Sequence, residues 1–363
     1  MGGSWDCHCA LCCGPLNICC VHIGEGDGDQ GKAGGPDNSS ISEDSYCEER
    51  PYSSSLVSEE STKWIHQCRA LCFDSSNEAV FISGVGHYDD YGYFEVREPG
   101  NDPHDTNPDM YHCYEDSGEW EVLTFPFHEA CYRVLAERLG YKKSSEIDTY
   151  ALYKVFKQYN DSAYELGLDY GGVKTEQTWD SRRGEEYLVC SPDDGGVELK
   201  DTIWSLVPSR LLLAEPSPDL SHRVTHDPFS AVPPDLLQEI LSYLSVHDAL
   251  NLMQASQHIC SNTREPQYWA EMIGFHLAPW FWEIDDLVAE QNFVDYKGLF
   301  LWLDAVTQPR KGVEGPWMGL ANRRRIWGVC EQLADAYRVA LNQEIVERGV
   351  MSDHEEGEEG AGT

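Results

Sequence analysis

Hydrophobic positions in residues 63–213 follow two spacings, as expected for a domain that mixes helices and strands. Apolar side chains three and four residues apart predict helices over residues 131–139 and 152–159, and the same spacing recurs from Trp64 to Cys72. Short apolar runs bounded by turn residues predict strands at Ala79–Ser83, Tyr93–Val96 and Glu186–Cys190.

The second half of the chain carries the helical spacing throughout. Residues 229–276 predict a compact unit of short helices, and residues 290–306 and 320–348 predict two longer ones. Gly349 suits the end of the last helix. The expected fold class is therefore α+β, with a Cys-rich mixed N-terminal domain followed by an all-helical unit and C-terminal helices.

The length of the chain, 363 residues, allows roughly two or three domains. Segments dominated by Gly, Ser and acidic residues hold too little apolar surface to offset the entropy of ordering, so they are expected to be disordered. The predicted division is a Cys-rich segment 1–23, a disordered acidic linker 24–62, a mixed domain 63–213, a helical unit 227–276, a C-terminal helical region 277–350 and a disordered acidic tail 351–363.

The charge of the chain limits its partners. Lys and Arg number 26 and Asp and Glu number 63, which gives a net charge of −37. A surface this negative repels phosphate, so we expect no binding to nucleic acid and none to anionic membranes. Proteins or cations are the partners that this charge favours.

The lack of a recognisable targeting signal and the cysteine usage predict an intracellular protein. No apolar run approaches the roughly 18 residues of a membrane span, and the N-terminus has no basic and then apolar signal sequence. The 14 Cys are therefore expected to be reduced, in the cytoplasm or the nucleus or both. Six of them lie within the first 20 residues, which calls for a separate explanation.

The helical unit begins with signals for a well-defined first helix. Pro233 and Pro234 fix the backbone at a helix start, and Asp235 suits the positive end of the helix dipole. The apolar face that follows is broader than three short helices can enclose, so part of it is expected to form an interface. That face comprises Leu236, Leu237, Ile240, Leu241 and Leu244.

The stretch 227–275 resembles an F-box. The resemblance lies in Val232-Pro233, Asp235-Leu236-Leu237, Ile240 to Leu244, Asp248 and Trp269, while Val232 and Ser256-Gln257-His258 depart from the usual residues. It implies binding to a Skp-type adaptor, and through it to a cullin scaffold. The alternative is an ordinary helical hairpin whose Leu residues pack internally. The implied adaptor contacts are Pro233, Leu236, Leu237, Ile240, Leu241 and Leu244.

The whole chain is similar to a group of fungal F-box proteins that begin with a Cys-rich motif. Four motifs carry this similarity, and they add little about function beyond the F-box. They are Cys7–Leu16, Phe125–Tyr132, Gly184–Val189 and Asn322–Trp327.

Two pairs of residues have the spacing of metal ligands. Cys9 and Cys12 lie two residues apart before a Gly-Pro turn, and His128 and Cys131 fall one turn apart at a helix start. Three thiols and an imidazole suit a closed, structural zinc site. The alternative is that His128 and Cys131 are core residues while the N-terminal thiols are free or acylated. Other candidate thiols are Cys7, Cys13, Cys19, Cys20 and Cys113.

Arg323, Arg324 and Arg325 are expected to open the last helix, where cations oppose the helix dipole by about 0.3–1 kcal/mol each. In so acidic a chain, internal ion pairs explain them most simply. They also suit a pocket for an acidic or phosphorylated segment of a substrate, because Arg recognises anions through two hydrogen bonds. Nuclear import is a third interpretation.

No nucleophile is paired with a base along the sequence, and the GxSxG, P-loop and EF-hand patterns are missing. The resemblance therefore implies a non-catalytic subunit: an F-box substrate receptor of an SCF-type cullin–RING ubiquitin ligase, with an unknown protein substrate. The alternative is a zinc-stabilised protein-interaction scaffold that is not coupled to ubiquitin ligation. A third is an enzyme with an unrecognised site.

Overall fold

The computed structural model describes residues 6–24, 51–97, 108–114, 122–173, 178–192, 224, 226–244, 246–263, 266–274, 278–284 and 295–358. The chain divides into two compact units. The first, here called the N-terminal unit, combines Met1–Asp193 with Gln308–Thr363, and the second, the inserted unit, is Asp194–Thr307. The last helix thus groups with the N-terminal domain, whereas the sequence-based division placed it in a separate region.

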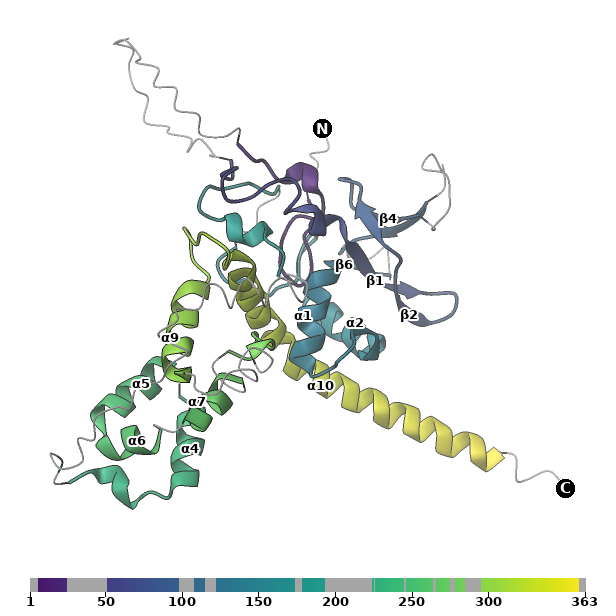
Figure 1. Cartoon of the computed structure of the whole chain (residues 1–363). Coiled ribbons are helices and arrows are strands. Elements are labelled where there is room, and N and C mark those ends of the chain that lie inside the picture. The colour runs from purple at the N-terminus through teal and green to yellow at the C-terminus, as the bar shows by residue number, and fades with distance from the viewer. Residues whose placement is uncertain are drawn as a thin grey trace, which may run out of the picture. The chain divides into compact units, whose positions relative to one another are not determined.

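Six strands of the described chain form one antiparallel sheet in the N-terminal unit (Figure 1). Five follow the order β2-β1-β3-β4-β5, and β6 pairs with β1, aligning Cys68 with His128. This register places His128, at the end of β6, beside Cys68, at the start of β1. The strands are β1 Cys68–Asp74, β2 Ala79–Ile82, β3 Gly86–Tyr88, β4 Tyr93–Val96, β5 Asp109–His112 and β6 Phe125–His128.

Strand β1 corrects the helical spacing noted from Trp64 to Cys72. Trp64 belongs to a short 3-10 helix, η2 (Lys63–His66), and the strand begins two residues later at Cys68. Residues Ala70 to Cys72 are all fully buried, so the strand shows no alternation of apolar and polar positions. A short, continuously buried strand cannot be told from a helix by periodicity alone, which explains the error.

The two helices predicted after the sheet are confirmed as α1 (Glu129–Leu139) and α2 (Thr149–Gln158). The strand predicted at Glu186–Cys190 is wrong, because the chain forms a buried 3-10 helix, η4 (Glu186–Val189). The carboxylate of Glu186 accepts the backbone N–H of Gly184 at 2.7 Å and of Ser53 at 3.1 Å. The bond from Gly184 tightens the turn before η4, and the bond from Ser53 joins η4 to the segment that precedes β1. Short 3-10 helices also occur at η1 (Ile18–Cys20) and η3 (Ser144–Glu146).

Helix α10 (Met318–Glu358) packs along α1, α2 and η4 and completes the N-terminal unit (Figure 1). It continues through Gly349, so the stop predicted there is wrong. Tyr337 is buried on its inner face, where the hydroxyl accepts the backbone N–H of Asp148 at 2.9 Å and bonds the Tyr141 hydroxyl at 3.2 Å. Asp148 caps α2, so this contact joins α10 to the start of that helix.

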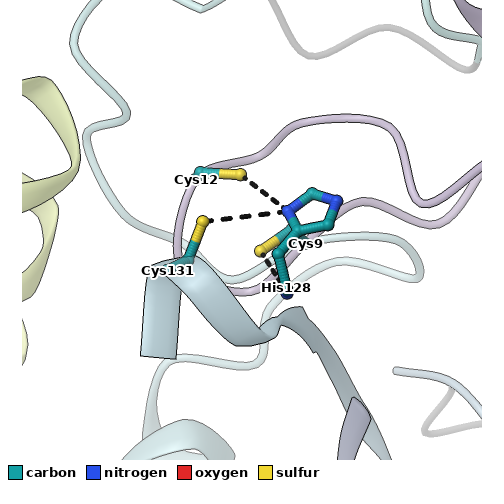
Figure 2. A group of neighbouring side chains, drawn as sticks. All are labelled: Cys9, Cys12, His128 and Cys131. Atoms are coloured by element: carbon teal, nitrogen blue, oxygen red, sulfur yellow. Dashed lines mark hydrogen bonds between the residues drawn. The ribbon is translucent and has the colours of Figure 1, made fainter. Parts of the chain in front are cut away.

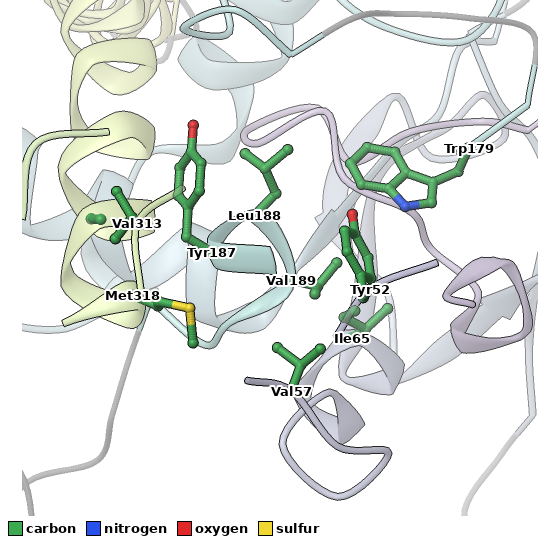
Figure 3. Packing of buried hydrophobic residues seen from close by; sticks show 10 residues of the cluster. Tyr52, Val57, Ile65, Trp179, Tyr187, Leu188, Val189, Val313 and Met318 are labelled. Carbon is green, nitrogen blue, oxygen red and sulfur yellow. The ribbon is translucent and has the colours of Figure 1, made fainter. Parts of the chain in front are cut away.

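An apolar cluster of the N-terminal unit joins parts of the chain on both sides of the insertion (Figure 3). Tyr52 and Val57 pack there with Leu188 and Val189 of η4 and with Met318 of α10. The prediction of a disordered linker is therefore wrong for residues 51–62, whose aromatic and aliphatic side chains are core residues. The rest of that predicted linker, residues 25–50, lies outside the described residues.

The inserted unit is helical, as predicted. The carboxylate of Asp227 joins the start of η7 to the start of α6. It accepts the Ser256 hydroxyl at 2.8 Å and the backbone N–H groups of Phe229 at 3.0 Å and His258 at 2.9 Å. Trp269 donates to the Thr263 carbonyl at 2.8 Å and stacks on Phe300. The elements are η7 Pro228–Ala231, α4 Pro234–Ser242, α5 Val246–Ala255, α6 Gln257–Asn262, α7 Pro266–Met272 and α9 Tyr296–Thr307.

The observed fold class is the predicted α+β, with a strand-rich N-terminal region followed by helices. The predicted loop at 100–109 and the boundary at 214–228 fall mostly outside the described residues. The prediction of a disordered tail over residues 351–363 is wrong for residues 351–358, which continue α10, and residues 359–363 lie outside the described residues. Among the described helices, none combines the length and apolar character needed to cross a bilayer.

The Tyr337→Phe substitution tests how α10 is held. The buried N–H of Asp148 would lose its partner, so the free energy of unfolding should fall by about 1–2 kcal/mol. Urea unfolding followed by circular dichroism measures this loss. The matched control is Tyr91→Phe, at a side chain that is 80% exposed, which should change stability by less than about 0.5 kcal/mol.

Candidate functional site

The first half of the candidate metal site is a tight turn near the N-terminus. The backbone N–H groups of Cys12 and Cys13 both point to the Cys9 carbonyl, at 3.3 and 2.8 Å, and Cys13 adopts a left-handed conformation with φ of 52°. The backbone N–H of Gly14 then donates to the Cys12 sulfur at 3.3 Å. A Cβ on Gly14 would lie 3.1 Å from that sulfur, so Gly allows the backbone to approach the thiol.

The second half of the site lies at the junction of β6 and α1. His128 ends the strand in an extended conformation and Cys131 occupies the first turn of the helix. Both side chains are buried, 1% and 0% exposed. The backbone N–H of His128 donates to the Cys9 sulfur at 3.4 Å, which brings the two halves together.

The four ligand atoms converge on one point (Figure 2). They come from Cys9, Cys12, His128 and Cys131, and all lie within 4.8 Å of one another. The sulfurs of Cys12 and Cys131 lie 3.4 and 3.8 Å from Nδ1 of His128. The predicted pairs, more than a hundred residues apart in the chain, therefore meet in a buried cluster that could hold a metal ion.

The imidazole of His128 is oriented for ligation. Its Nε2 lies 2.9 Å from the Pro15 carbonyl, so Nε2–H donates to that oxygen when the ring is neutral. The lone pair is then on Nδ1, which faces the three thiols. Metal-binding His residues commonly donate their second ring N–H to a carbonyl in this way, which fixes the tautomer.

The ionisation of the cluster also favours a cation. Burial opposes the Cys9 thiolate, but hydrogen bonds from Cys12 and Cys131 hold the pKa of Cys9 well below its usual range. Burial, followed by hydrogen bonds with Cys12 and Cys9, raises the pKa of Cys131 well above its usual range. Without a metal, ionisation of one thiol therefore suppresses ionisation of the next. A divalent cation removes that conflict, because metal ligation requires the thiolates.

The remaining candidate thiols lie elsewhere. Cys7 and Cys113 are buried beside each other, Cys13 donates to the Glu165 carboxylate at 3.3 Å, and Cys19 is exposed. Cys20 forms a second, half-buried group with Asp6 and Asp90, in which burial raises the pKa of the thiol to about 12. This group offers only one thiol beside two carboxylates and is half-buried, so it is the weaker candidate for a zinc-type site.

Sequence reasoning missed Cys68, which lies next to the cluster. Its register opposite His128 in the β1–β6 pair brings the thiol near the imidazole. The thiol donates to the Ile65 carbonyl at 2.8 Å, and burial raises its pKa. Cys68 is therefore a neutral neighbour of the four-residue cluster. Strand register is a non-local property that the spacing of residues along the chain does not reveal.

The six implied adaptor contacts divide between two sides of helix α4. Leu236 and Ile240 are exposed at 50% and 42%, whereas Leu237 and Leu241 are buried at 3% and 1%. Pro233 is exposed and Leu244 is half-buried. Tyr243, which was not among the predicted contacts, is 82% exposed and continues the outer face one turn beyond Ile240. The outer face is therefore Leu236, Ile240 and Tyr243.

The three arginines lie in the second turn of α10, because the helix starts at Met318. Arg323 is fully buried and its Nε donates to the Pro192 carbonyl at 2.6 Å. Arg325 is 4% exposed and donates to oxygens of Cys12, Tyr170 and Asn322. Because the side chains of Arg323 and Arg325 are buried, neither guanidinium is exposed to a substrate anion, and the anion-pocket interpretation is wrong for these two residues. Arg324 is half-buried, and its role stays a prediction.

Comparison with protein families matches residues 229–270 to the F-box domain, so this part of the chain forms an F-box domain. The match supports a general role as an F-box adaptor of SCF-type ubiquitin ligases, whose F-box subunits are usually non-catalytic. Comparisons with curated proteins and with solved structures found no match.

Single substitutions on α4 separate the core of the F-box from its outer face. Leu237→Ala removes a buried side chain and should lower the stability of the F-box unit by about 2–4 kcal/mol. Leu236→Ala, on the neighbouring exposed residue, should change it by less than about 0.5 kcal/mol. Hydrogen exchange of the α5 and α6 amides measures both losses. Equal effects would contradict the division of α4 into an inner and an outer side.

Proposed function

We propose that this chain is an F-box substrate receptor of an SCF-type cullin–RING ubiquitin ligase. The observation that carries the proposal is the outer face of α4, where Leu236, Ile240 and Tyr243 recur at helical spacing and remain exposed. In a domain of this family, such an unpartnered apolar face suits a Skp-type adaptor, and through it the cullin scaffold.

The N-terminal unit is proposed to hold the protein target. It is a folded body with its own sheet and core, formed by chain on both sides of the F-box unit. In this role the chain carries out no chemical step. It raises the concentration of the target near a ubiquitin-conjugating enzyme. The proposed site of action is the cytoplasm or the nucleus, and the free thiols of the described cysteines agree with a reducing compartment.

Co-purification with a Skp-type adaptor tests the proposal. The full chain should bind the adaptor, and the double substitution Leu236→Asp with Ile240→Asp should abolish binding by placing charges in an apolar contact. Because both side chains are exposed, the variant should keep its circular dichroism spectrum. The matched control is Val339→Asp on α10, a 58% exposed apolar residue whose change should leave binding intact.

If the parent chain does not bind the adaptor, the F-box interpretation of the function fails. The alternative is then a zinc-stabilised protein-interaction scaffold that is not coupled to ubiquitin ligation. The observation that favours this second candidate is the buried Cys and His cluster, which ties the N-terminal segment into the folded unit without reference to an adaptor.

We also infer that the metal of the cluster is zinc. Three thiols and one imidazole, with sulfur and nitrogen as the ligand atoms, are the set that Zn²⁺ prefers for four-coordinate structural sites. With four protein ligands the site leaves no position for a substrate or a reactive water. Bound zinc would therefore contribute to folding and not to catalysis.

Elemental analysis tests the zinc proposal. The purified chain should contain about one zinc ion, and Cys9→Ser or Cys131→Ser should lower the content several-fold and reduce the melting temperature. Cys19→Ser is the matched control, since it changes an exposed thiol of the same N-terminal segment. A wild-type chain that holds no zinc after purification without chelators would refute the assignment.

A further inference from the structure

The side chain of Arg325 joins the candidate metal site to helix α10. Its Nη1 donates to the carbonyls of Cys12 at 2.9 Å and of Tyr170 at 3.1 Å. Its Nη2 and Nε donate to Oδ1 of Asn322 at 2.8 and 3.2 Å. A Cβ on Gly171 would lie 2.9 Å from Cγ of Arg325, so the surrounding chain packs tightly against the side chain.

The charge of Arg325 is not balanced by the groups that it bonds. Within the described part of the chain, its hydrogen-bond acceptors are two carbonyl oxygens and an amide oxygen, all neutral. Burying a cation without an anionic partner is strongly destabilising, so a negative charge is expected close by. The Glu165 carboxylate accepts the Cys13 thiol at 3.3 Å, and among the described residues no ion pair joins it to Arg325.

The candidate metal site supplies the missing charge. A divalent ion bound by three thiolates and a neutral imidazole carries one net negative charge. That charge would be centred on the cluster that includes the Cys12 thiolate, and the guanidinium holds the carbonyl of the same residue. The buried cation and the buried metal–thiolate group would therefore stabilise each other.

We propose that Arg325 is a positioning residue of the metal site and its counter-charge. It fixes the turn from Cys9 to Gly14 in the geometry that binds the metal, and it couples metal binding to the docking of α10. The inference rests on the zinc site proposed above. Its consequence is that metal binding joins the chain that precedes the inserted unit to the chain that follows it, since Cys12 and Arg325 lie on opposite sides of the insertion in sequence.

Zinc affinity in competition with a chromophoric chelator tests the proposal. Arg325→Met should weaken zinc binding by about 10–100-fold, the usual cost of losing a group that orients a metal ligand. The ligands themselves are unchanged, so the cobalt-substituted variant should keep a tetrahedral absorption spectrum with thiolate charge-transfer bands. Arg338→Met is the matched control: it lies on the same helix, is exposed and pairs with Asp335, and it should bind zinc like the wild type.

The Arg325→Lys variant separates charge from geometry. Lys keeps the cation but lacks the planar fork that bonds Asn322 and two carbonyls at once. Its zinc affinity should lie between those of the wild type and Arg325→Met. If Arg325→Met does not fold, Arg325→Lys decides alone, and wild-type zinc affinity in that variant would overturn the proposal.

Hydrogen exchange of the wild-type chain provides a test without any variant. Removing zinc with a chelator should increase exchange in the first turns of α10, around Asn322–Cys330, before the amides of β4 lose protection. Unchanged protection of α10, or simultaneous loss in α10 and β4, would overturn the coupling. If the wild type holds no zinc at all, the zinc assignment itself fails. If it holds zinc and Arg325→Met binds zinc equally well, only the role of Arg325 fails.

Discussion

The N-terminal unit depends on a length of irregular chain that lies inside its core. Residues Cys7 to Leu16 are all buried, yet the stretch forms neither a helix nor a strand. Its tight turn pairs some backbone groups within the stretch, and others find partners elsewhere in the unit. His8 donates to the Tyr164 carbonyl at 2.9 Å and Ala10 to the Pro126 carbonyl at 2.8 Å. Such a segment gains little from local structure, so cross-links to the rest of the unit decide whether it stays in place. The cluster of Cys9, Cys12, His128 and Cys131 is the strongest such link if it binds a metal.

Helix α10 supplies side-chain hydrogen bonds to backbone carbonyls in η4 and in the segment that follows it. Asn322 donates to the carbonyls of Leu188 at 3.1 Å and Cys190 at 2.8 Å, and Arg323 to that of Pro192 at 2.6 Å. The Leu188 carbonyl lies within η4, and the carbonyls of Cys190 and Pro192 follow it. Buried polar side chains of α10 thus satisfy backbone acceptors at the end of η4 and just beyond it. The C-terminal helix is therefore part of the N-terminal fold, and the F-box unit is an insertion within it.

The sequence predicted features that local spacing determines, and it failed where distant segments decide. The helical periods over 131–139 and 152–159 identified α1 and α2, and the spacing within each ligand pair identified residues that meet in space. Strand β1 and helix η4 were missed because burial by distant partners removes the alternation that marks a strand and the polar face that marks a surface turn. The burial of Arg325 depends on a partner more than three hundred residues away, Cys12, which no local pattern reveals.

The F-box helix shows the same limit on a smaller scale. Leu236 and Leu237 are adjacent and equally apolar, so periodicity places both on one broad face, yet one is exposed and the other is core. A helix with an apolar face this wide has more surface than its own small unit can bury. The buried side, with Leu237 and Leu241, stabilises the unit, and the outer side, with Leu236 and Ile240, stays available for a partner. One helix therefore serves both folding and binding. A substitution on α4 that abolishes binding identifies a contact only if the side chain is exposed, because loss of a buried side chain would also unfold the unit.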